Sequence, residues 1–359
     1  MQRHNSSARK GAFLYMSTKK VYQVHKWSGL LAGLFILLMG LTGSILVFHE
    51  ELEALEYSKE WTTPNNQAVS IDRALKTVIE KFPGWDIRLQ RFSSRPTNTL
   101  IFQLRRPDAR LIIFVHPSQG NIIKVMDQKD SKVYWVLKLH YSLHSGIIGE
   151  FLILLVGLIF VLSLVTGLIV YRKALLDILT FRTRFLKKRK RSFVSSLHRY
   201  VGVWALVFNL LIVLTGTVIS FEIVNSGLKN KSSITSLPST PKIDISVDLI
   251  LKKLHVKQPN FNPSYIRFPT LSGNPIIIVG KVTNEAIIYS KFYNTVNVNP
   301  VSGEMSALQI TRSLSSLVRG IHFVDYGNLW IKFFFCLVGI SGPVLSISGY
   351  LLWKWKKKA

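Results

Sequence analysis

The residues of this sequence that could do chemistry are histidines, and they flank an apolar segment. His25 and His49 enclose residues 27–48, which carry no charge. The two histidines are 24 residues apart (49 − 25), or about 36 Å along a helix that rises about 1.5 Å per residue. Because the hydrocarbon core of a bilayer is about 30 Å thick, this segment predicts a membrane helix with a histidine near each face.

The histidines recur in an internal duplication. With an offset of 173 (198 − 25), HKWSG at 25–29 aligns with HRYVG at 198–202. With an offset of 182 (322 − 140), His140 aligns with His322. A unit of helix, outer segment and helix is therefore repeated with the same topology, which predicts a pseudo-two-fold axis along the membrane normal. The repeat predicts two facing pairs at two depths, His25 with His198 and His140 with His322.

Two further histidines belong to the first copy only. LTGSILVFHE at 41–50 aligns with LTGTVISFEI at 214–223, so Glu222 stands where His49 stands in the first copy. His144 is matched by Tyr326 in the second copy. Because His140 and His144 are spaced i, i+4, they are expected on one helix face. If these histidines bind metal ions, the set of ligands at the outer border is not symmetric, and one of the metal ions could be five-coordinate.

Histidine pairs at matched depths point to haem. Neutral imidazole is an axial ligand of haem iron, and a helical bundle can hold a flat macrocycle between facing helices. Lys26 or Arg199, beside the histidines at the cytoplasmic ends, could pair with haem propionates. Glycines on the same helices would let a ring or a neighbouring helix approach the backbone. These are Gly29, Gly33, Gly40, Gly43, Gly202 and Gly216.

A simpler interpretation of the same residues is interfacial polarity and helix packing. Histidines are tolerated at membrane borders, small residues serve helix contacts, and tryptophans form interfacial belts. This interpretation leaves the symmetric pairing unexplained. His4, His116 and His255 fall outside the pairing pattern and are expected to be surface or loop residues.

Composition supports a membrane protein with soluble parts. The chain has 359 residues, 48% of them hydrophobic, with a net charge of +27 and a mean hydropathy of +0.26. The basic residues cluster beside apolar runs, which argues for membrane topology and against nucleic-acid binding. Cys336 is the single cysteine, so this chain alone can form neither an intramolecular disulfide nor an iron–sulfur cluster.

Loop charge predicts the orientation. Residues 172–199 carry ten Lys and Arg side chains against one acid, Asp177, which places this loop in the cytoplasm. We expect both termini there, the first span to be uncleaved, and a multi-pass protein of the bacterial inner membrane. The expected order is a basic N-terminus 1–20, TM1 21–49, outer module 50–139, TM2 140–171, basic loop 172–197, TM3 198–222, outer module 223–321, TM4 322–353 and tail 354–359.

The two outer segments are expected to be similar α+β modules. SIDRALKTVIEKFPG predicts an amphipathic helix with Ile71, Leu75, Val78 and Ile79 on one face, and SVDLILKKLHVKQPN predicts its counterpart. Strands are expected in TLIFQLRR, RLIIFVHPSQGNII, PIIIVGK and EAIIYSKFYNTVNVNPVSGEM. The turns VHPSQGNI and VNPVSGEM align with an offset of 183 (299 − 116). The predicted fold class is a four-span α-helical bundle carrying two outward-facing α+β modules.

HKWSGLLAG, LTGSILVFHEELE, LHYSLHSG and SLHRYVGVW resemble the PepSY-associated transmembrane family, and HPSQG and NPVSG resemble PepSY-type domains. The resemblance implies a bacterial inner-membrane protein tied to iron uptake, similar to siderophore-iron reductases with two b-type haems. It implies the ligand set His25, His49, His140, His144, His198 and His322, with His25, His198, His140 and His322 as axial ligands of the haem iron.

The resulting hypothesis is an oxidoreductase that passes electrons outward through two b-type haems to a ferric siderophore. The siderophore holds iron(II) much more weakly than iron(III), so reduction releases the metal. Arg88, Arg91, Arg105, Arg106 and Arg267 could attract the anionic chelate, although each could be ordinary surface. The sequence has no Gly-x-Gly-x-x-Gly fingerprint, so the donor is expected to be a separate cytoplasmic protein or a quinol. The alternatives are a non-redox PepSY binding protein anchored by its helices and a siderophore or iron transporter. The spans carry almost no interior charge, which argues against transport.

Overall fold

The computed structural model describes residues 18–64, 67–92, 97–230, 243–271, 273–283, 285–324 and 328–357. Most of the predicted basic N-terminus, the last residues of the tail, His4 and Tyr326 lie outside these ranges. The described chain divides into two compact units. Unit 1 comprises 1–40, 155–214 and 338–359, and unit 2 comprises 41–154 and 215–337.

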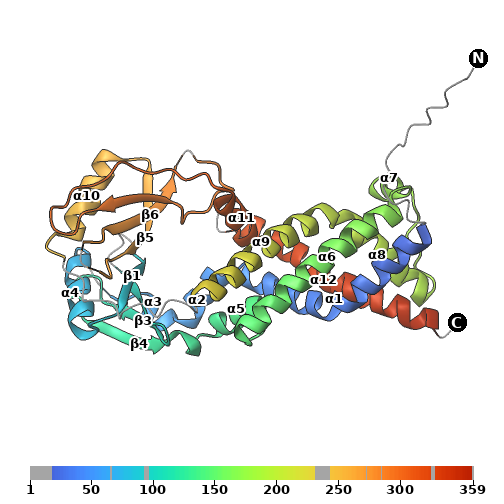
Figure 1. Ribbon diagram of the computed structural model, residues 1–359, viewed down its shortest axis with the longest axis horizontal. Helices are drawn as coiled ribbons and strands as arrows, with labels where there is room; N and C mark the ends of the chain where they lie inside the picture. The colour runs from blue at the N-terminus through green and yellow to red at the C-terminus, as the bar shows by residue number, and fades with distance from the viewer. Residues whose placement is uncertain are drawn as a thin grey trace, which may run out of the picture. The chain divides into compact units, whose positions relative to one another are not determined.

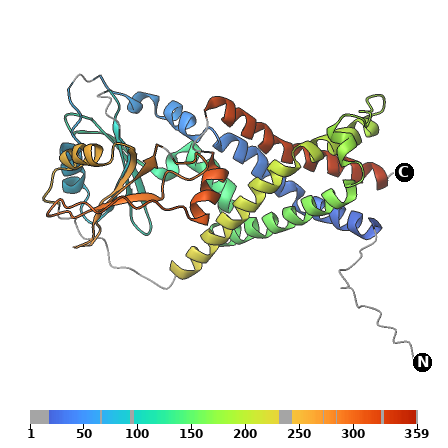
Figure 2. The same ribbon diagram turned by 90° about the horizontal axis from the view of Figure 1, so that it is seen from above.

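Four helices are long and apolar enough to cross a membrane, as the sequence predicted. They are α1 (Thr18–Leu46), α6 (Gly146–Tyr171), α9 (Leu206–Asn230) and α12 (Leu329–Lys357), and they are the longest ribbons in Figures 1 and 2. In the most apolar 18-residue stretch of each helix, only 22% to 33% of the residues are buried by other parts of the chain. Such helices expose their apolar side chains to the surroundings, as membrane spans do.

The helix boundaries differ from the predicted spans. The predicted segment 140–171 contains the end of α5 (Lys132–Ser142) and the whole of α6. α5 ends where Leu143 and His144 take positive φ angles, which interrupts the helix. In the second copy α11 (Leu314–Phe323) ends at Val324, which has the same left-handed conformation. The histidines His140 and His322 therefore lie on short helices that precede the spans α6 and α12.

Short helices also flank the other spans. α2 (His49–Glu56) and α3 (Ser58–Trp61) follow α1, so His49 begins a separate helix. α7 (Leu175–Leu179) and α8 (Lys190–Trp204) fill the basic loop, and α8 carries His198 before α9 begins at Leu206. Tyr200 on α8 donates a hydrogen bond from its hydroxyl to the Thr183 carbonyl, and this contact ties the loop to the helix that carries His198.

The outer segments form one sheet and not the two separate modules that the sequence suggested. Its seven antiparallel strands run in the order β4-β3-β2-β1-β5-β6-β7. The two halves join where β1 pairs with β5. The strands are β1 (Asp86–Arg91), β2 (Leu100–Arg105), β3 (Arg110–Val115), β4 (Ile122–Asp127), β5 (Phe261–Arg267), β6 (Ile276–Val282) and β7 (Asn294–Val298), and the 3-10 helix η1 (Gln128–Asp130) follows β4.

Helices α4 (Ile71–Lys81) and α10 (Val247–Lys257) cover one face of this sheet (Figure 1). The predicted amphipathic face of α4 is confirmed, because Ile71, Leu75 and Val78 are buried in the main core. The core takes its other members from alternate positions of the strands, as a sheet with one buried face requires.

The two covering helices cap one another. The Asp72 carboxylate accepts hydrogen bonds from the Val247 amide (2.6 Å) and the Ser246 hydroxyl (2.5 Å). The Asp248 carboxylate in return accepts from the Ile71 amide (3.0 Å) and the Ser70 hydroxyl (3.2 Å). Each carboxylate therefore satisfies free amide groups at the start of the other helix, where a negative charge is favoured.

Three predictions about the strands need correction. Residues 285–293 (EAIIYSKFY) were expected to be strand but are irregular, and only Asn294–Val298 is a strand. Glu285 is instead buried and accepts a hydrogen bond from the Asn294 side-chain amide (2.6 Å). β1 and β5 were not predicted, because DIRLQR is rich in charge and FNPSYIR contains a proline; these two strands join the halves of the sheet.

Candidate functional site

The structure brings the four symmetric histidines together in two pairs, one within each compact unit. In unit 1 the ring centroids of His25 and His198 are 6.3 Å apart. In unit 2 the ring centroids of His140 and His322 are 6.5 Å apart. We call these the first pair and the second pair. Each pair combines one histidine from each copy of the duplicated unit.

The spacing within each pair is that of two imidazoles on one metal ion. A metal–imidazole bond is about 2 Å long, so two such bonds in line leave the ring centroids about 6 Å apart. The rings of the first pair are inclined by 66° and those of the second pair by 44°. Neither pair is therefore a parallel-stacked aromatic contact.

The Nδ1 atom of each histidine in the first pair is held by a neighbouring span. His25 Nδ1 lies 2.9 Å from the Ser163 carbonyl oxygen, which accepts its proton. His198 Nδ1 lies 2.8 Å from the Ser348 hydroxyl, which itself donates to the Val344 carbonyl (2.6 Å). Because that hydroxyl hydrogen is committed, Nδ1 is the donor here as well. Nε2 is then the unprotonated nitrogen that can bind a metal.

Threonine hydroxyls lie beside the Nδ1 atoms of the second pair. His140 Nδ1 lies 2.8 Å from the Thr42 hydroxyl on α1, and His322 Nδ1 lies 3.1 Å from the Thr215 hydroxyl on α9. Thr42 and Thr215 are equivalent by the offset of 173. A hydrogen bond to one ring nitrogen fixes the orientation of an imidazole, and each of the four rings has such a bond.

Each ring also packs on a glycine beside its hydrogen-bond partner. A Cβ atom built on Gly167 would lie 3.0 Å from His25 Cε1, and one built on Gly349 would lie 3.4 Å from His198 Cε1. The equivalent distances are 3.2 Å from Gly43 to His140 and 2.9 Å from Gly216 to His322. The glycines therefore leave the space in which the imidazole edges lie.

These contacts revise the predicted role of the glycines. Gly43 and Gly216 contact histidines, whereas Gly40 lies against Pro343, with a built Cβ only 2.4 Å from the proline Cδ. The remaining predicted glycines face Ser163, Ser346 and Leu345 and serve helix packing. Gly167 and Gly349 were missed. A signal was available, because each of the four spans contains a Thr-Gly or Ser-Gly dipeptide, at 42–43, 166–167, 215–216 and 348–349.

A cavity of about 620 Å³ adjoins the first pair. This volume lies within the range of about 300–1,000 Å³ that is usual for cofactor sites. The lining includes both histidines together with Lys26 and Arg199, the two predicted partners of haem propionates. Arg199 Nε is buried without a hydrogen bond to any residue that the structure describes. Two imidazoles at this spacing, beside a guanidinium whose Nε has no acceptor among the described residues, fit a haem, whose macrocycle supplies the remaining iron ligands and whose carboxylates suit arginine.

His49 and His144 have other surroundings. His49 Nδ1 lies 3.1 Å from the Leu46 carbonyl oxygen, at the junction of α1 and α2. The expectation that His144 shares a helix face with His140 is wrong, because His144 lies beyond the end of α5 with a φ of 57°. Its ring packs against that of Trp135, with centroids 5.0 Å apart and the planes inclined by 38°. The other described histidines agree with their expected places, because His116 accepts amides within a turn and His255 is exposed on α10.

The second copy has an ion pair where the first copy has His49. Glu222 bonds to Arg319 (2.5 Å) and accepts from the Ser315 hydroxyl (2.7 Å). In the first copy the neighbouring acids of α2 also form ion pairs, Glu50 with Lys291 (2.9 Å) and Glu51 with Lys332 (2.6 Å). Burial raises the pKa of Glu50, whereas the charge of Lys291 and its hydrogen bond lower it, and the net effect is a lowered pKa.

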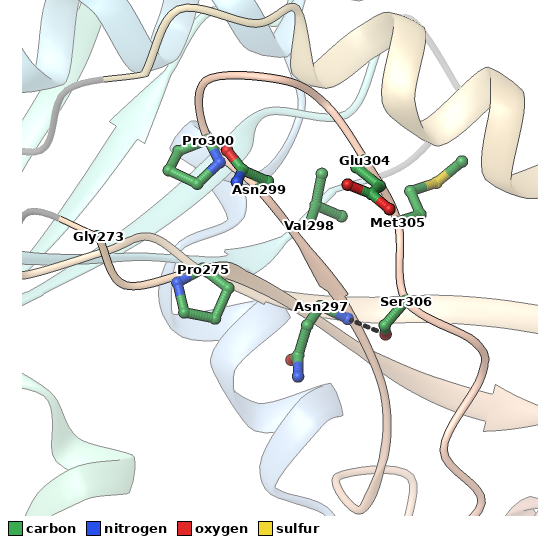
Figure 3. A pocket seen from close by; sticks show the side chains of 9 residues that line it. All are labelled: Gly273, Pro275, Asn297, Val298, Asn299, Pro300, Glu304, Met305 and Ser306. Carbon is green, nitrogen blue, oxygen red and sulfur yellow. Dashed lines mark hydrogen bonds between the residues drawn. The ribbon is translucent and has the colours of Figure 1, made fainter.

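A smaller pocket of about 290 Å³ lies beside β7 (Figure 3). It is bordered by the turn that aligns with HPSQG, and the Asn297 amide donates to the Ser306 hydroxyl at its edge (3.0 Å). Glu304 is the charged residue of its lining, which includes neither a histidine nor an arginine. This pocket therefore suits neither haem iron nor an anionic chelate.

Four apolar spans, a seven-stranded sheet and two hydrogen-bonded histidine pairs characterise this multi-pass α+β membrane protein. Residues 22–357 match the PepSY-associated TM region family. The chain therefore belongs to this family. A comparison with curated proteins finds no significant match.

Proposed function

We propose that this protein is an inner-membrane oxidoreductase that holds two b-type haems and passes electrons from the cytoplasmic side to a periplasmic ferric siderophore. The observation that carries the proposal is the fourfold repetition of one arrangement. Each histidine of the two pairs has a bonded Nδ1 and a glycine under its ring, and the pairs have centroid spacings of 6.3 and 6.5 Å. Plain helix packing requires none of these features.

The residues that would hold the haems follow from this arrangement. Nε2 of His25 and His198 would bind one iron, and Nε2 of His140 and His322 would bind the other. Haem iron, when bound, alternates between its ferric and ferrous states and so accepts and gives one electron at a time. Ser163, Ser348, Thr42 and Thr215 hold the rings in place, and hydrogen bonds to metal-bound histidines also raise their basicity.

The substrate follows from the chemistry of iron chelates. Oxygen ligands hold the ferrous ion more weakly than the ferric ion, so adding one electron to a ferric chelate releases iron without breaking the chelator. The outward direction rests on the ten basic residues of the loop 172–199, which favour the cytoplasm. The electron donor would be a cytoplasmic reductant or a membrane quinol.

The first test is an absorption spectrum of the detergent-purified protein, oxidised and dithionite-reduced, with haem quantified as the pyridine complex. We expect about two b-type haems per chain. His198→Ala and His322→Ala should each lose or alter one haem. His255→Ala, which changes an exposed histidine on α10, is the matched control and should retain both. A colourless protein from haem-replete cells, or unchanged spectra in both pair variants, would contradict the proposal.

The second test separates electron transfer from haem binding. Protein reduced with dithionite and freed from excess reductant is mixed anaerobically with a ferric chelate that has carboxylate groups, and iron(II) is measured with a ferrous-specific dye. We expect reoxidation of the haem bands together with stoichiometric iron(II). Protein that contains both haems but is not reoxidised would overturn the assignment of the chelate as electron acceptor and leave the haem assignment standing.

A further inference from the structure

A cluster of arginines lies on the sheet face opposite to α4 and α10. Along β1, Ile87 and Leu89 are buried in the main core, so Arg88 between them points to the other face. Arg88 and Arg267 are direct partners in the antiparallel pair of β1 and β5. Their side chains therefore lie on the same face, directly opposite one another.

This pair lies on the symmetry axis of the sheet. An offset of 179 (267 − 88) relates Arg88 to Arg267, and the same offset relates Ile87 to the buried Ile266. The duplication has therefore placed one arginine from each half at the junction of the halves. Like charges in directly opposed positions of a sheet repel one another, and Asp86, which pairs with Arg88, supplies one carboxylate for the two arginines.

A third arginine adds to the same charge. Arg105 is the strand partner of Asp86, two residues before Arg88, and so shares its face. Burial lowers the pKa of Arg105, and the charge of Arg88 lowers it further. The hydrogen-bond acceptor of Arg105 is the neutral Gln103 side chain (2.7 Å). Gln103 carries no charge, and the carboxylate opposite Arg105, that of Asp86, is bonded to Arg88.

The acceptors within reach do not satisfy the cluster. Asp86 bonds to Arg88 through two nitrogens (2.6 and 3.0 Å), and the Tyr265 hydroxyl accepts from Arg88 Nη1 (3.4 Å). Arg267 Nε is buried without a hydrogen bond to any described residue, and the same holds for Nη1 of the neighbouring Arg91. Native proteins satisfy nearly all buried polar atoms, which indicates a missing acceptor at this place.

Arg91 extends the cluster along the same face. Its strand partner Ile101 belongs to a small apolar cluster on this face of the sheet, and its guanidinium lies 3.6 Å from the centre of the Trp61 ring. A ligand bound at the arginines would therefore lie beside an indole ring. Tryptophan fluorescence can then report on binding without any added label.

We propose that Arg88, Arg105 and Arg267 form a binding site for the carboxylate groups of an iron chelate, which rests on the proposed function. Guanidinium groups recognise carboxylates through two parallel hydrogen bonds, a geometry that lysine does not provide. The site defines the substrate class as chelates that keep carboxylate groups exposed around the metal. Arg106 does not belong to it, because it bonds the Pro83 and Gly84 carbonyls and stacks on Trp85.

The test uses gallium(III) citrate, a carboxylate chelate whose metal is not reduced under these conditions, so that binding is measured without electron transfer. The detergent-purified full chain is titrated with it, and tryptophan fluorescence and calorimetry give the dissociation constant. Losing one charge-assisted contact weakens binding by about tenfold or more. We expect this loss for Arg267→Gln and for Arg88→Gln. Lys253→Gln, which removes one charge from the exposed side of α10, should bind as the wild type does.

Three results would overturn the site. They are unchanged affinity in both arginine variants, an equal loss in Lys253→Gln, and inorganic phosphate binding as tightly as gallium citrate, which would indicate a generic anion site. The unfolding temperature of each variant must match the wild type, and Arg105→Gln replaces any variant that fails to fold. A colourless protein that still binds gallium citrate would refute the haem proposal and support the site. A protein with both haems that binds no gallium citrate would support the haem proposal and refute the arginine site.

Discussion

The two copies of the duplicated unit agree where they hold histidines and differ around them. His25 and His198 are equivalent, as are His140 and His322, and every one of these rings has a bonded Nδ1 and a glycine neighbour. The copies differ at Glu222, which pairs with Arg319, whereas His49 and Leu137 occupy the equivalent places. The shared features define the site, and the differences show where each copy has its own environment.

A second difference lies inside the spans of unit 1. Asn209 and Ser341 are buried and hydrogen-bonded to one another (2.8 Å), whereas Ile36 and Ile159 stand at the equivalent positions of the first copy. A polar pair within a membrane helix fixes helix register because each partner would otherwise be unsatisfied. The second copy therefore carries a specific lock between α9 and α12 at this level, and the first copy relies on apolar packing.

The largest expected effect is a difference between alanine substitutions at two glycines, one beside each histidine pair. In Gly216→Ala the new Cβ would lie 2.9 Å from His322 Cε1, whereas in Gly349→Ala it would lie 3.4 Å from His198 Cε1. Overpacking of this kind costs about 1–3 kcal/mol. Gly216→Ala should therefore displace His322, lower the unfolding temperature and remove the haem that we propose for the second pair, while Gly349→Ala stays close to wild type. Absorption spectra and thermal unfolding measure both effects, and equal behaviour of the two variants would refute this ranking.

The next effect tests the ion pair that distinguishes the copies. Arg319→Leu leaves the half-buried Glu222 without its guanidinium, at a cost of about 1–2 kcal/mol in the free energy of unfolding. The double variant Glu222→His, Arg319→Leu gives the second copy the residues of the first and should recover much of that loss. Denaturation of the two single variants and the double variant forms a double-mutant cycle. Additive losses in this cycle would mean that the two side chains are not coupled.

The sequence predicted the parts of the molecule that depend on periodicity and repetition. The four spans, the amphipathic face of α4 and the pairing of His25 with His198 follow from apolar runs and from the duplication, and the structure agrees with them. The union of the halves into one sheet could not be predicted. β1 and β5 meet over two residue pairs, and neither strand has the uninterrupted apolar alternation by which strands are recognised.

The ligand environment was only partly predictable, for a different reason. The histidine set came from the sequence, but the position of His144 depended on the left-handed residues that end α5, and a left-handed leucine has no strong sequence signal. The hydrogen-bond partners Ser163 and Ser348 lie more than 100 residues from their histidines. Contacts of this kind depend on which helices become neighbours, which a single span cannot specify.

A smaller effect is expected at the starts of α4 and α10, where each helix supplies a capping carboxylate to the other. Asp72→Ala removes a carboxylate that accepts one amide and one hydroxyl at the start of α10, and Asp248→Ala removes one that accepts two amides and one hydroxyl at the start of α4. Loss of a cap costs about 1 kcal/mol, so chemical denaturation should give similar losses for both variants. Asp108→Ala, at an exposed position outside the sheet strands, is the control and should leave stability unchanged. A loss in only one capping variant would show that the two halves are not equivalent at this junction.

The smallest expected effect is a pH dependence of the folding stability that comes from one of these two capping carboxylates, that of Asp248. Burial raises the pKa of Asp248, and the charge of Asp72 acts in the same direction, while the amides of Ile71 and Asp72 oppose the shift. The folded protein therefore binds a proton at Asp248 more readily than the unfolded chain does. Its contribution to stability is complete below the unfolded pKa of about 3.9 and is lost as the pH rises through the folded pKa.

Asp248→Asn should remove this dependence. The unfolding temperature of the wild type, compared with that of the variant between about pH 4 and pH 7, should show an extra decrease with rising pH. Asp108→Asn should follow the wild type throughout. Parallel curves for the wild type and Asp248→Asn would mean that the carboxylate titrates alike in the folded and unfolded states. In that case the exchanged caps stabilise the junction through their hydrogen bonds alone, and the effects of burial and of the Asp72 charge on the pKa of Asp248 are fully offset by the hydrogen bonds that Asp248 accepts.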